Sequence, residues 1–443
     1  MKTNIVVGLD IGTTKIAAIV AQKNEYGKIE ILGHGNAPSA GMMRGSVMNI
    51  DKTVESIKTA VEEAELRSGF KIKEVYVGIA GQHIKSFQLR HQVNRTTGEE
   101  ITQAEVEEFV ALMEKIQREP NEKILHVIPQ EYIVDDVYGI KDPVGMSGSL
   151  LAANFHIITG QVSAIKNIKR SVEKAGLVVK DLILEPLASA LAVLDKKDIL
   201  AGVALVDIGG GTTDIAIYHD DILRHTAVIA LGGNIITEDI QGGCVIIEPN
   251  AKKLKEKFGS AIASEIKEDA IIAIPGLRGR PPKEISLKNL SGIIQARMED
   301  ILESVLFEIK ASGFEKKLIA GIVLTGGGAL LRHVAQLTEF VTHMDTRIGY
   351  PNEHLSSSEK TEPIANPIFA TSVGLVMWGL EKEAPVEIPE IVETPVVPET
   401  SEKSKKGAKK PQKKSSLFDT ISKGLGNITG ILADFMDEVK DDK

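Results

Sequence analysis

The stretch DIGTTKIA at residues 10–17 decides the fold, because the chain repeats it as DIGGGTTDIA at residues 207–216. Each copy follows a short apolar segment, residues 5–9 or 203–206, and continues into a second one. This pattern predicts a tight β-hairpin whose tip offers backbone N–H groups and hydroxyls. Two such tips that faced each other would hold a polyphosphate from both sides, so the repeat favours duplicated halves that close on a nucleotide.

Each predicted hairpin begins at a carboxylate, Asp10 in the first copy and Asp207 in the second. In nucleotide sites Mg²⁺ keeps several of its waters and is bound by one or two carboxylates together with phosphates. We therefore expect Asp10 and Asp207 to hold a hydrated Mg²⁺ ion. A P-loop and a dinucleotide-binding turn are both excluded, because neither spacing is present and each copy leads into a strand rather than a helix.

A third glycine-rich stretch, LTGGGALL at residues 324–331, follows an apolar segment and precedes a predicted helix. Glycine allows the backbone to approach a flat ligand closely. The alternative is an ordinary turn between a strand and a helix, which rarely needs so many glycines in a row. The stretch is therefore a third candidate element of the same site.

The composition is that of a soluble globular protein with a sizeable core, since 43% of the 443 residues are hydrophobic and 26% are charged. Aromatic residues make up only 4% and the net charge is −9, so we expect no nucleic-acid partner. The single cysteine, Cys244, cannot form an internal disulfide. No apolar run approaches the roughly 20 residues that span a bilayer, and the N-terminus lacks a signal-peptide core, so we expect a cytosolic body.

The rhythm of strands and helices divides the chain into parts. An α/β alternation over residues 1–84 gives way to a block with an acidic helix near 104–117 and a strand near 126–134, which indicates an inserted subdomain. A core strand is expected at 320–324. The predicted parts are lobe I at residues 1–84, 161–190 and 366–380, the insert at 85–160, lobe II at 191–365, and within lobe II a polar, helical outer subdomain at 242–315.

The composition changes beyond Gly379, since residues 381–402 contain seven glutamates and four prolines without a helical or strand period. We expect residues 381–415 to be a disordered, extended linker. Residues 416–440 then show an amphipathic helical pattern, directly after a lysine-rich run at 403–414. The apolar residues of this helix that we expect to contact a membrane are Leu417, Phe418, Ile421, Leu425, Ile428, Leu432 and Phe435.

Glycines within the terminal helix, Gly424, Gly426 and Gly430, each cost about 1 kcal/mol of helix stability relative to alanine. The segment is therefore expected to become helical only on a surface. A membrane interface would bury the apolar face, and the adjacent lysines would add attraction to anionic lipid. A groove on a protein partner could bind the same face, and an inert tail is the third alternative. The lysine-rich run favours the membrane.

With these residues in view, the chain resembles the FtsA family of bacterial cell-division proteins, which are actin-like and bind ATP. The two hairpins and the stretch 325–330 alone would indicate only the superfamily of actin, heat-shock chaperones and sugar kinases. The more specific part lies in the insert, where HVIPQEY at residues 126–132 and residues 139–148 resemble the subdomain particular to FtsA. The segments expected to join the lobes, residues 184–194 and 367–374, fit as well.

The resemblance implies an α/β, actin-like fold of two duplicated lobes around a nucleotide cleft, with an inserted FtsA-type subdomain and a C-terminal amphipathic helix. It implies a protein that binds ATP and Mg²⁺, polymerises head to tail, and lies peripherally on the cytoplasmic side of the cell membrane at the division site. FtsA-like proteins anchor FtsZ filaments, whose C-terminal peptide would dock within residues 242–315, on a helix at 287–311. Other division proteins are implied as partners, with the insert involved.

The resemblance also carries a set of nucleotide contacts onto this chain. Those implied for phosphate are Gly12, Thr13, Thr14, Lys15, Gly209, Gly210, Gly211, Thr212 and Thr213. Those implied along the rest of the cleft are Gly232, Gly233, Asn234, Lys255, Gly326, Gly327, Gly328 and Ala329. One departure is Lys252, because related chains usually have glutamate there, which pairs with the lysine at position 255 to contact ribose and base. The reversed charge leaves the ribose contact open.

Glu185 lies where actin-like ATPases place a residue that orients the attacking water, which makes it the candidate catalytic residue. The alternative is a structural position at the start of a helix, since Pro186 suits the first turn. We expect weak or absent ATP turnover, with ATP acting mainly to close the lobes and permit polymerisation. Rival interpretations are an MreB-type filament, a pilus-assembly actin-like protein, and a sugar or acid kinase, which would need a catalytic aspartate.

Overall fold

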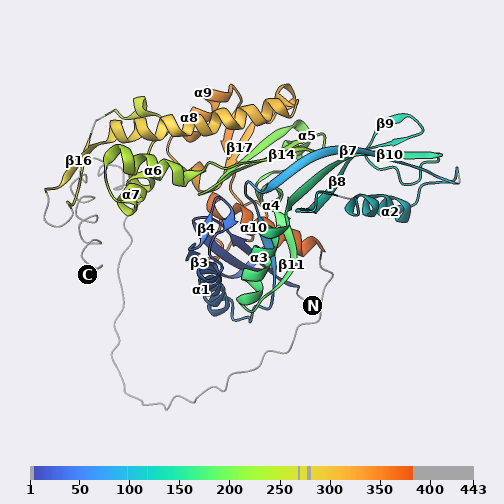
Figure 1. Cartoon of the computed structure of the whole chain (residues 1–443), viewed down its shortest axis with the longest axis horizontal. Coiled ribbons are helices and arrows are strands. Elements are labelled where there is room, and N and C mark those ends of the chain that lie inside the picture. The colour runs from blue at the N-terminus through green and yellow to red at the C-terminus, as the bar shows by residue number, and fades with distance from the viewer. Residues whose placement is uncertain (1–3, 97, 117, 268–269, 277–280, 383–443) are drawn as a thin grey trace, which may run out of the picture. The chain divides into compact units, whose positions relative to one another are not determined.

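The structure is a computed structural model that describes residues 4–382 except 97, 117, 268–269 and 277–280 (Figure 1). All of these residues belong to one compact unit, Met1–Ile388. The predicted terminal helix at 416–440 lies outside the described residues, as does the predicted linker from residue 383 onwards. None of the helices within the described ranges is long and apolar enough to cross a membrane.

The first half of the chain builds a five-stranded sheet in the order β11-β6-β1-β2-β3. Its strands are β1 (Ile5–Ile11), β2 (Lys15–Lys23), β3 (Ile29–Pro38), β6 (Glu74–Ile79) and β11 (Val178–Leu184). β1, β2 and β3 pair antiparallel, whereas β1 pairs with β6, and β6 with β11, in parallel. β1 and β2 are buried over nearly their whole length, as expected for strands covered on both faces.

The second half builds another five-stranded sheet, in the order β14-β13-β12-β17-β18. Its strands are β12 (Val203–Ile208), β13 (Thr213–His219), β14 (Ile222–Ile229), β17 (Ile322–Thr325) and β18 (Thr346–Ile348). The pairing senses repeat those of the first sheet strand for strand. The predicted duplication is therefore confirmed at the level of whole sheets.

Helices pack on these sheets and connect them. The longer ones are α1 (Ile50–Ser68), α3 (Val162–Lys174), α4 (Glu185–Val193), α6 (Gly233–Cys244), α7 (Glu248–Phe258), α8 (Leu287–Ala311), α9 (Val334–Thr342) and α10 (Ala370–Lys382). α1 begins because the side chain of Asn49 accepts a hydrogen bond from the N–H of Lys52, and it ends at Gly69, which adopts the left-handed conformation. Its buried face includes Ile57 and Ala60, which belong to the core of the first sheet.

The insert forms a four-stranded antiparallel sheet in the order β7-β10-β8-β9, with one helix. Its elements are β7 (Ile84–Asn94), α2 (Gln103–Glu114), β8 (Glu122–Val134), β9 (Val137–Ile140) and β10 (Leu150–Gln161). The helix packs on the sheet through Phe109, whose ring meets that of Phe155 edge-on at 5.3 Å between centroids. α2 ends earlier than the expected residue 117, and β8 begins four residues before the expected 126, because Glu122 pairs with Gln161 at the end of β10.

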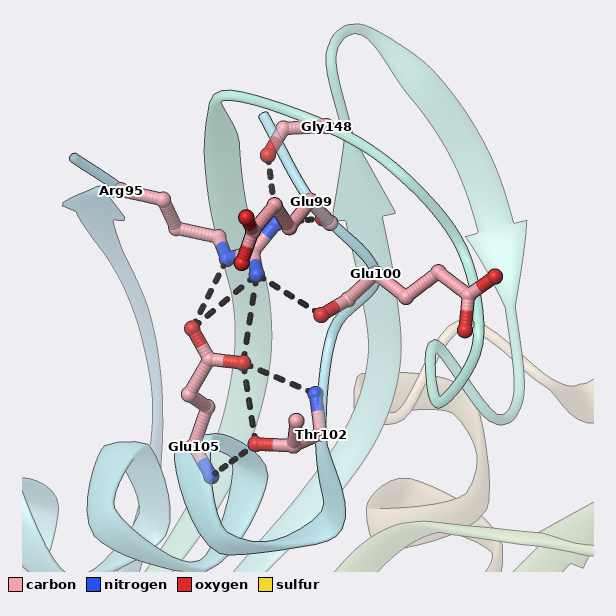
Figure 2. Close-up of polar contacts among 6 residues, drawn as sticks. All are labelled: Arg95, Glu99, Glu100, Thr102, Glu105 and Gly148. Atoms are coloured by element: carbon pink, nitrogen blue, oxygen red, sulfur yellow. Dashed lines mark hydrogen bonds and ion pairs between the residues drawn. The ribbon is translucent and has the colours of Figure 1, made fainter. Parts of the chain in front are cut away.

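A buried arginine fixes the start of α2, as Figure 2 shows. The side chain of Arg95 is only 5% exposed and pairs with Glu105, which also accepts from the N–H of Thr102 in a capping box. The same guanidinium donates to the backbone carbonyl oxygens of Glu99, Glu100 and Gly148. One side chain thus joins the end of β7, the start of α2 and the loop before β10.

The insert begins with β7, directly after β6 of the first sheet, but it contacts β14, the edge strand of the second sheet. Ser86 of β7 donates to the carbonyl oxygen of Thr226 at 2.9 Å, and Gln130 of β8 donates to that of Leu223 at 2.7 Å. His156 of β10 bonds the Thr226 hydroxyl at 2.9 Å. Side chains of the insert therefore satisfy edge carbonyls of β14 that would otherwise face solvent.

Two expectations differ from the structure in lobe II. The outer subdomain at 242–315 is not wholly helical, because β15 (Ile271–Ile274) and β16 (Lys283–Ser286) form a two-stranded sheet within it. Alternating isoleucines bury one face of β15, which favours a strand over a helix. The core strand expected at 320–324 is β17, shifted because residues before Ile322 form a turn.

The last helix also extends further than expected. α10 continues to Lys382, two residues into the predicted linker. Both Trp378 Nε1 and Lys382 Nζ donate to Asp181 Oδ2, at 3.2 and 3.3 Å, so the final turn is anchored to β11. The change of composition after Gly379 cannot indicate this contact, so it places the end of the helix too early.

Candidate nucleotide site

Both glycine-rich repeats form hairpins of the same size. The last strand pair is Ile11 with Ile16 in the first hairpin and Ile208 with Thr213 in the second. Each therefore closes a loop of four residues, 12–15 and 209–212. The structure gives the two repeats the hairpin form that the sequence predicts.

The two hairpin tips face each other closely. The Thr14 hydroxyl donates to Asn234 Oδ1 at 3.4 Å, across the lobes. A Cβ added to Gly210 would lie 1.7 Å from Thr14 Oγ1, and one added to Gly211 would lie 2.5 Å from Thr13 Oγ1. The glycines at the second tip are therefore required by close approach to the threonines of the first.

The structure brings the two candidate Mg²⁺ carboxylates into one site. Both are buried, at 6% exposure for Asp10 and 7% for Asp207. Ser372 donates to Asp10 Oδ2 at 3.2 Å, and its neighbour Thr371 donates to Asp207 Oδ2 at 3.2 Å. Adjacent residues of α10 thus contact carboxylates from both lobes.

A third carboxylate of this site is Asp214, which the sequence leaves open between a place near phosphate and a role in fixing the hairpin. Asp214 accepts from the Thr212 hydroxyl at 2.9 Å through Oδ2, while its buried Oδ1 has no hydrogen-bond partner among the described residues. Burial first, and then the nearby Asp207, raise the pKa of Asp214 to about 8. Burial also raises the pKa of Asp207, against the opposing effect of its hydrogen bond from Ser189. A cation near these oxygens would relieve both costs.

Lys15 is the cation that the structure places among these carboxylates. Its Nζ lies 3.4 Å from Asp10 Oδ2 and 4.3 Å from the centre of the Phe369 ring. The ammonium group is therefore held between a carboxylate and an aromatic face. Its position beside the first hairpin tip fits the phosphate role that the resemblance implies.

Glu185 is the first residue of α4, with Pro186 next to it in the first turn. Burial, followed by Asp10, Asp214 and Asp207, raises the pKa of Glu185 well above its usual range, while Lys15 opposes this shift. The side chain therefore lies in the same acidic cluster and also starts a helix, so both interpretations of the residue fit its place. No group of acidic, histidine or cysteine side chains that could by itself hold a metal occurs in the part of the chain that the structure describes.

The turn at Gly232–Asn234 lies directly against the second hairpin. The N–H groups of Gly233 and Asn234 donate to the carbonyl oxygens of Gly209 and Gly210, at 2.9 and 2.8 Å. Lys255 of α7 reaches the same turn and donates to the Gly233 carbonyl oxygen at 2.6 Å. Burial, opposed by Glu256 and assisted by the neighbouring Lys252, lowers the pKa of Lys255 to about 8. Lys252 itself is exposed.

The third glycine-rich stretch packs against the end of β12. Gly326 has φ +81°, and a Cβ there would lie 2.2 Å from Asp207 Oδ1. The following residues form a 3₁₀ helix, Gly327–Leu330, rather than leading directly into α9. Gly327 is exposed, whereas Ala329 is only 4% exposed and packs in the core. This burial leaves little of Ala329 for a ligand to contact.

Sequence reasoning missed three hydroxyl residues of this site, Ser189, Thr371 and Ser372. They lie within the segments 184–194 and 367–374, which the resemblance singled out as joining the lobes. A signal was available in the small hydroxyl side chains among apolar residues of both segments. Their partners, however, are far away in sequence.

His126, in the block specific to the resemblance, holds the chain just before Glu185. Its Nε2 accepts from the N–H of Leu184 at 3.1 Å, and its ring packs on Trp378. The pKa of His126 is lowered from 6.5 to about 4, chiefly by burial. Asp181 has a smaller effect that raises this pKa, and Lys382 has a still smaller one that lowers it.

We expect this histidine to make the protein less stable in acid. The pKa of His126 is lower in the folded protein than in the unfolded chain. The stabilisation that its neutral ring contributes is therefore complete above pH 6.5 and is lost as the pH falls towards 4. From pH 7 to pH 5 this one group should remove about 2 kcal/mol from the free energy of unfolding. His126→Gln keeps an acceptor without titrating, and urea unfolding at both pH values should show a smaller loss for the variant. Equal losses in both proteins would contradict the assignment.

The chain is 38% identical to the "Cell division protein FtsA" of Pseudomonas aeruginosa over 380 residues, which cover 86% of this chain and 90% of that protein. The chain belongs to the FtsA family. Proteins of the same name from Neisseria meningitidis and Escherichia coli are 39% and 38% identical, and the matches cover 86% of this chain and 92% and 93% of theirs.

Two family models match this FtsA-family chain in separate regions. "Cell division protein FtsA" matches residues 204–374, and "SHS2 domain inserted in FTSA" matches residues 81–159, where the β7-β10-β8-β9 sheet lies. Among solved structures, the "PilM-PilN type IV pilus biogenesis complex" aligns with a TM-score of 0.61 at 17% identity, covering 85% of this chain and 98% of that one. The α/β, actin-like fold with an FtsA-type insert is thereby confirmed, and this fold suggests nucleotide binding.

Proposed function

We propose that this FtsA-family chain is an ATP-binding, actin-like protein that polymerises on the cytoplasmic face of the membrane at the division site. There it anchors FtsZ filaments and helps to recruit other division proteins. The observation that carries the proposal is the pair of matched hairpins whose tips and root carboxylates meet between duplicated sheets. The cell-division part rests on the family.

The donor set at this site fits Mg–ATP. Asp10 and Asp207 are two buried carboxylates of the same cleft. Asp214 lies in the same cluster, and its Oδ1 has no hydrogen-bond partner among the described residues. Mg²⁺ is commonly bound through one or two carboxylates together with phosphate oxygens and water. Lys15 would donate to a phosphate, and the N–H groups of loops 12–15 and 209–212 would cradle the others. Gly326–Gly328 and Lys255 would line the adenosine side.

The surroundings of Glu185 support weak turnover. Burial, followed by Asp10, Asp214 and Asp207, raises the pKa of its carboxyl group well above the usual range. A raised pKa disfavours the charged form of the carboxyl group, which is the form that can accept a proton from water. We therefore propose that ATP serves chiefly to close the lobes. A robust turnover that Glu185→Ala abolishes would contradict this.

The parts outside the cleft would supply the attachments. Residues 416–440 would bind lipid through their apolar face, next to the lysine-rich run at 403–414. The outer subdomain at 242–315, with α8, would receive the C-terminal peptide of FtsZ. The insert would contact other division proteins, and a second copy of the chain would extend the filament.

Liposome co-sedimentation tests the membrane part of the proposal. The full chain with Mg–ATP should sediment with vesicles containing anionic lipid, and should carry a labelled FtsZ C-terminal peptide with it. A chain that ends after Lys382, where α10 ends, should remain in the supernatant yet still bind the peptide.

A charge placed on either face of the terminal helix gives the matched control. Phe418→Glu should reduce sedimentation by about tenfold, because it puts a charge into the apolar face, whereas Asn427→Glu adds the same charge on the opposite face and should have little effect. Equal effects of the two substitutions would exclude an oriented amphipathic contact. Binding of the FtsZ peptide to neither chain would exclude the tethering role.

A further inference from the structure

Two helices join the lobes and cross beside the proposed Mg²⁺ carboxylates. α4 follows β11 of the first sheet and leads towards β12 of the second, while α10 packs against both α4 and β1. They approach so closely that a Cβ on Gly374 of α10 would lie 1.7 Å from the carbonyl oxygen of Ala188. Side chains at this crossing can therefore reach groups of both lobes.

Three hydroxyl residues lie at the crossing, Ser189 on α4 and Thr371 and Ser372 on α10; we call them the linker-helix hydroxyls. Ser189 and Ser372 are fully buried and Thr371 is 7% exposed. Ser189 donates to Asp207 Oδ2 at 2.6 Å and lies 2.9 Å from the Thr371 hydroxyl, which donates to the same oxygen. Ser372 donates to Asp10 Oδ2. The set therefore contacts one carboxylate from each lobe.

The hydroxyls engage one oxygen of each carboxylate and leave the other directed at the glycine loops. Asp207 Oδ1 lies against Gly326, 2.2 Å from the point that a Cβ there would occupy. Asp10 Oδ1 lies 3.7 Å from the corresponding point on Gly12. Both glycines belong to the proposed nucleotide cleft. The Oδ2 hydrogen bonds thus fix the rotation in which Oδ1 faces the cleft.

We propose that the linker-helix hydroxyls are positioning residues, which hold Asp10 and Asp207 in the rotation that accepts the hydrated Mg²⁺ of Mg–ATP. This inference rests on the proposed function, because it concerns the same cleft. Since the hydroxyls belong to the helices that join the lobes, a change in the crossing of α4 and α10 turns the carboxylates. Affinity for Mg–ATP is in this way linked to closure of the lobes.

A nucleotide titration in two conditions tests the proposal. The full chain, Thr371→Val and Ser372→Ala are titrated with a fluorescent ATP analogue, once with excess Mg²⁺ and once with EDTA. Loss of an outer partner of a metal ligand costs about 10- to 100-fold in metal affinity. We expect each variant to bind about tenfold more weakly than the full chain with Mg²⁺, and equally in EDTA. Thr371→Ser should restore binding.

The matched control is Thr338→Val in α9, which makes the same isosteric change at a fully buried threonine outside the cleft. It should leave both titrations unchanged. If a substitution weakens binding equally with Mg²⁺ and in EDTA, the hydroxyl has only a structural role. If the variant binds the analogue as tightly as the full chain in both conditions, the hydroxyl does not contribute to binding. Either result overturns the inference. If the full chain itself binds no ATP analogue in either condition, the proposed function fails as well, so the two failures are distinguishable.

Discussion

We expect Lys15→Ala to weaken the proposed binding of Mg–ATP by about 3 kcal/mol, or roughly a hundredfold, because a buried hydrogen bond to a charged group contributes up to that amount. Lys15 is the cation beside Asp10 at the tip of the first hairpin, 3.4 Å from its carboxylate. Three further acidic groups, Asp207, Asp214 and Glu185, lie in the same cluster, and the pKa of each is raised. Removing the lysine therefore leaves phosphate to approach carboxylates without a counter-charge from the protein.

Isothermal titration of the full chain and the variant measures this loss. Lys58→Ala is the matched control, since it removes the same charge from an exposed position of α1 and should leave the affinity unchanged within a factor of about two. Lys15→Arg keeps the charge and should recover only part of the affinity, because the larger, planar guanidinium places its donors differently from the compact ammonium group that lies 3.4 Å from Asp10 Oδ2. An affinity that Lys15→Ala does not change would place the phosphates elsewhere.

The sequence predicts the duplicated architecture well because its evidence is local. A glycine-rich tip between two apolar segments defines a hairpin by itself, and its second copy at 207–216 reveals the repeat. The structure repeats more than the hairpins, since all five strands of each sheet follow the same order and pairing senses. Apolar runs predict strands such as β17, and only the limits of these strands differ in the structure.

Contacts that join distant segments were not predictable in the same way. Ser372 contacts Asp10, which lies 362 positions away in the chain, and no local sequence pattern around either residue indicates the other. The insert's bond from Gln130 to the edge of β14 is of the same kind. Packing of whole elements creates such contacts, so a single sequence can mark the residues as unusual but cannot pair them.

We expect Gly374→Ala to lower the free energy of unfolding by at least about 2 kcal/mol, because an added Cβ would lie 1.7 Å from the backbone carbonyl oxygen of Ala188 in α4 and would force the two helices apart. α10 is buried at this level, with Val373 and Leu375 in the core that joins both sheets. The shift also displaces Thr371 and Ser372, so affinity for Mg–ATP should fall together with the melting temperature.

Gly292→Ala in α8 is the matched control, because it makes the same change within a helix where no atom lies within 4 Å of the new Cβ. Alanine is the better helix former, so this variant should gain up to about 1 kcal/mol in stability. Thermal unfolding with and without Mg–ATP separates the two effects, since a variant that only loses packing is still stabilised by the ligand to the same extent. If Gly374→Ala melts like the full chain and keeps that ligand-induced shift, α4 and α10 are not in the close contact that fixes both carboxylates.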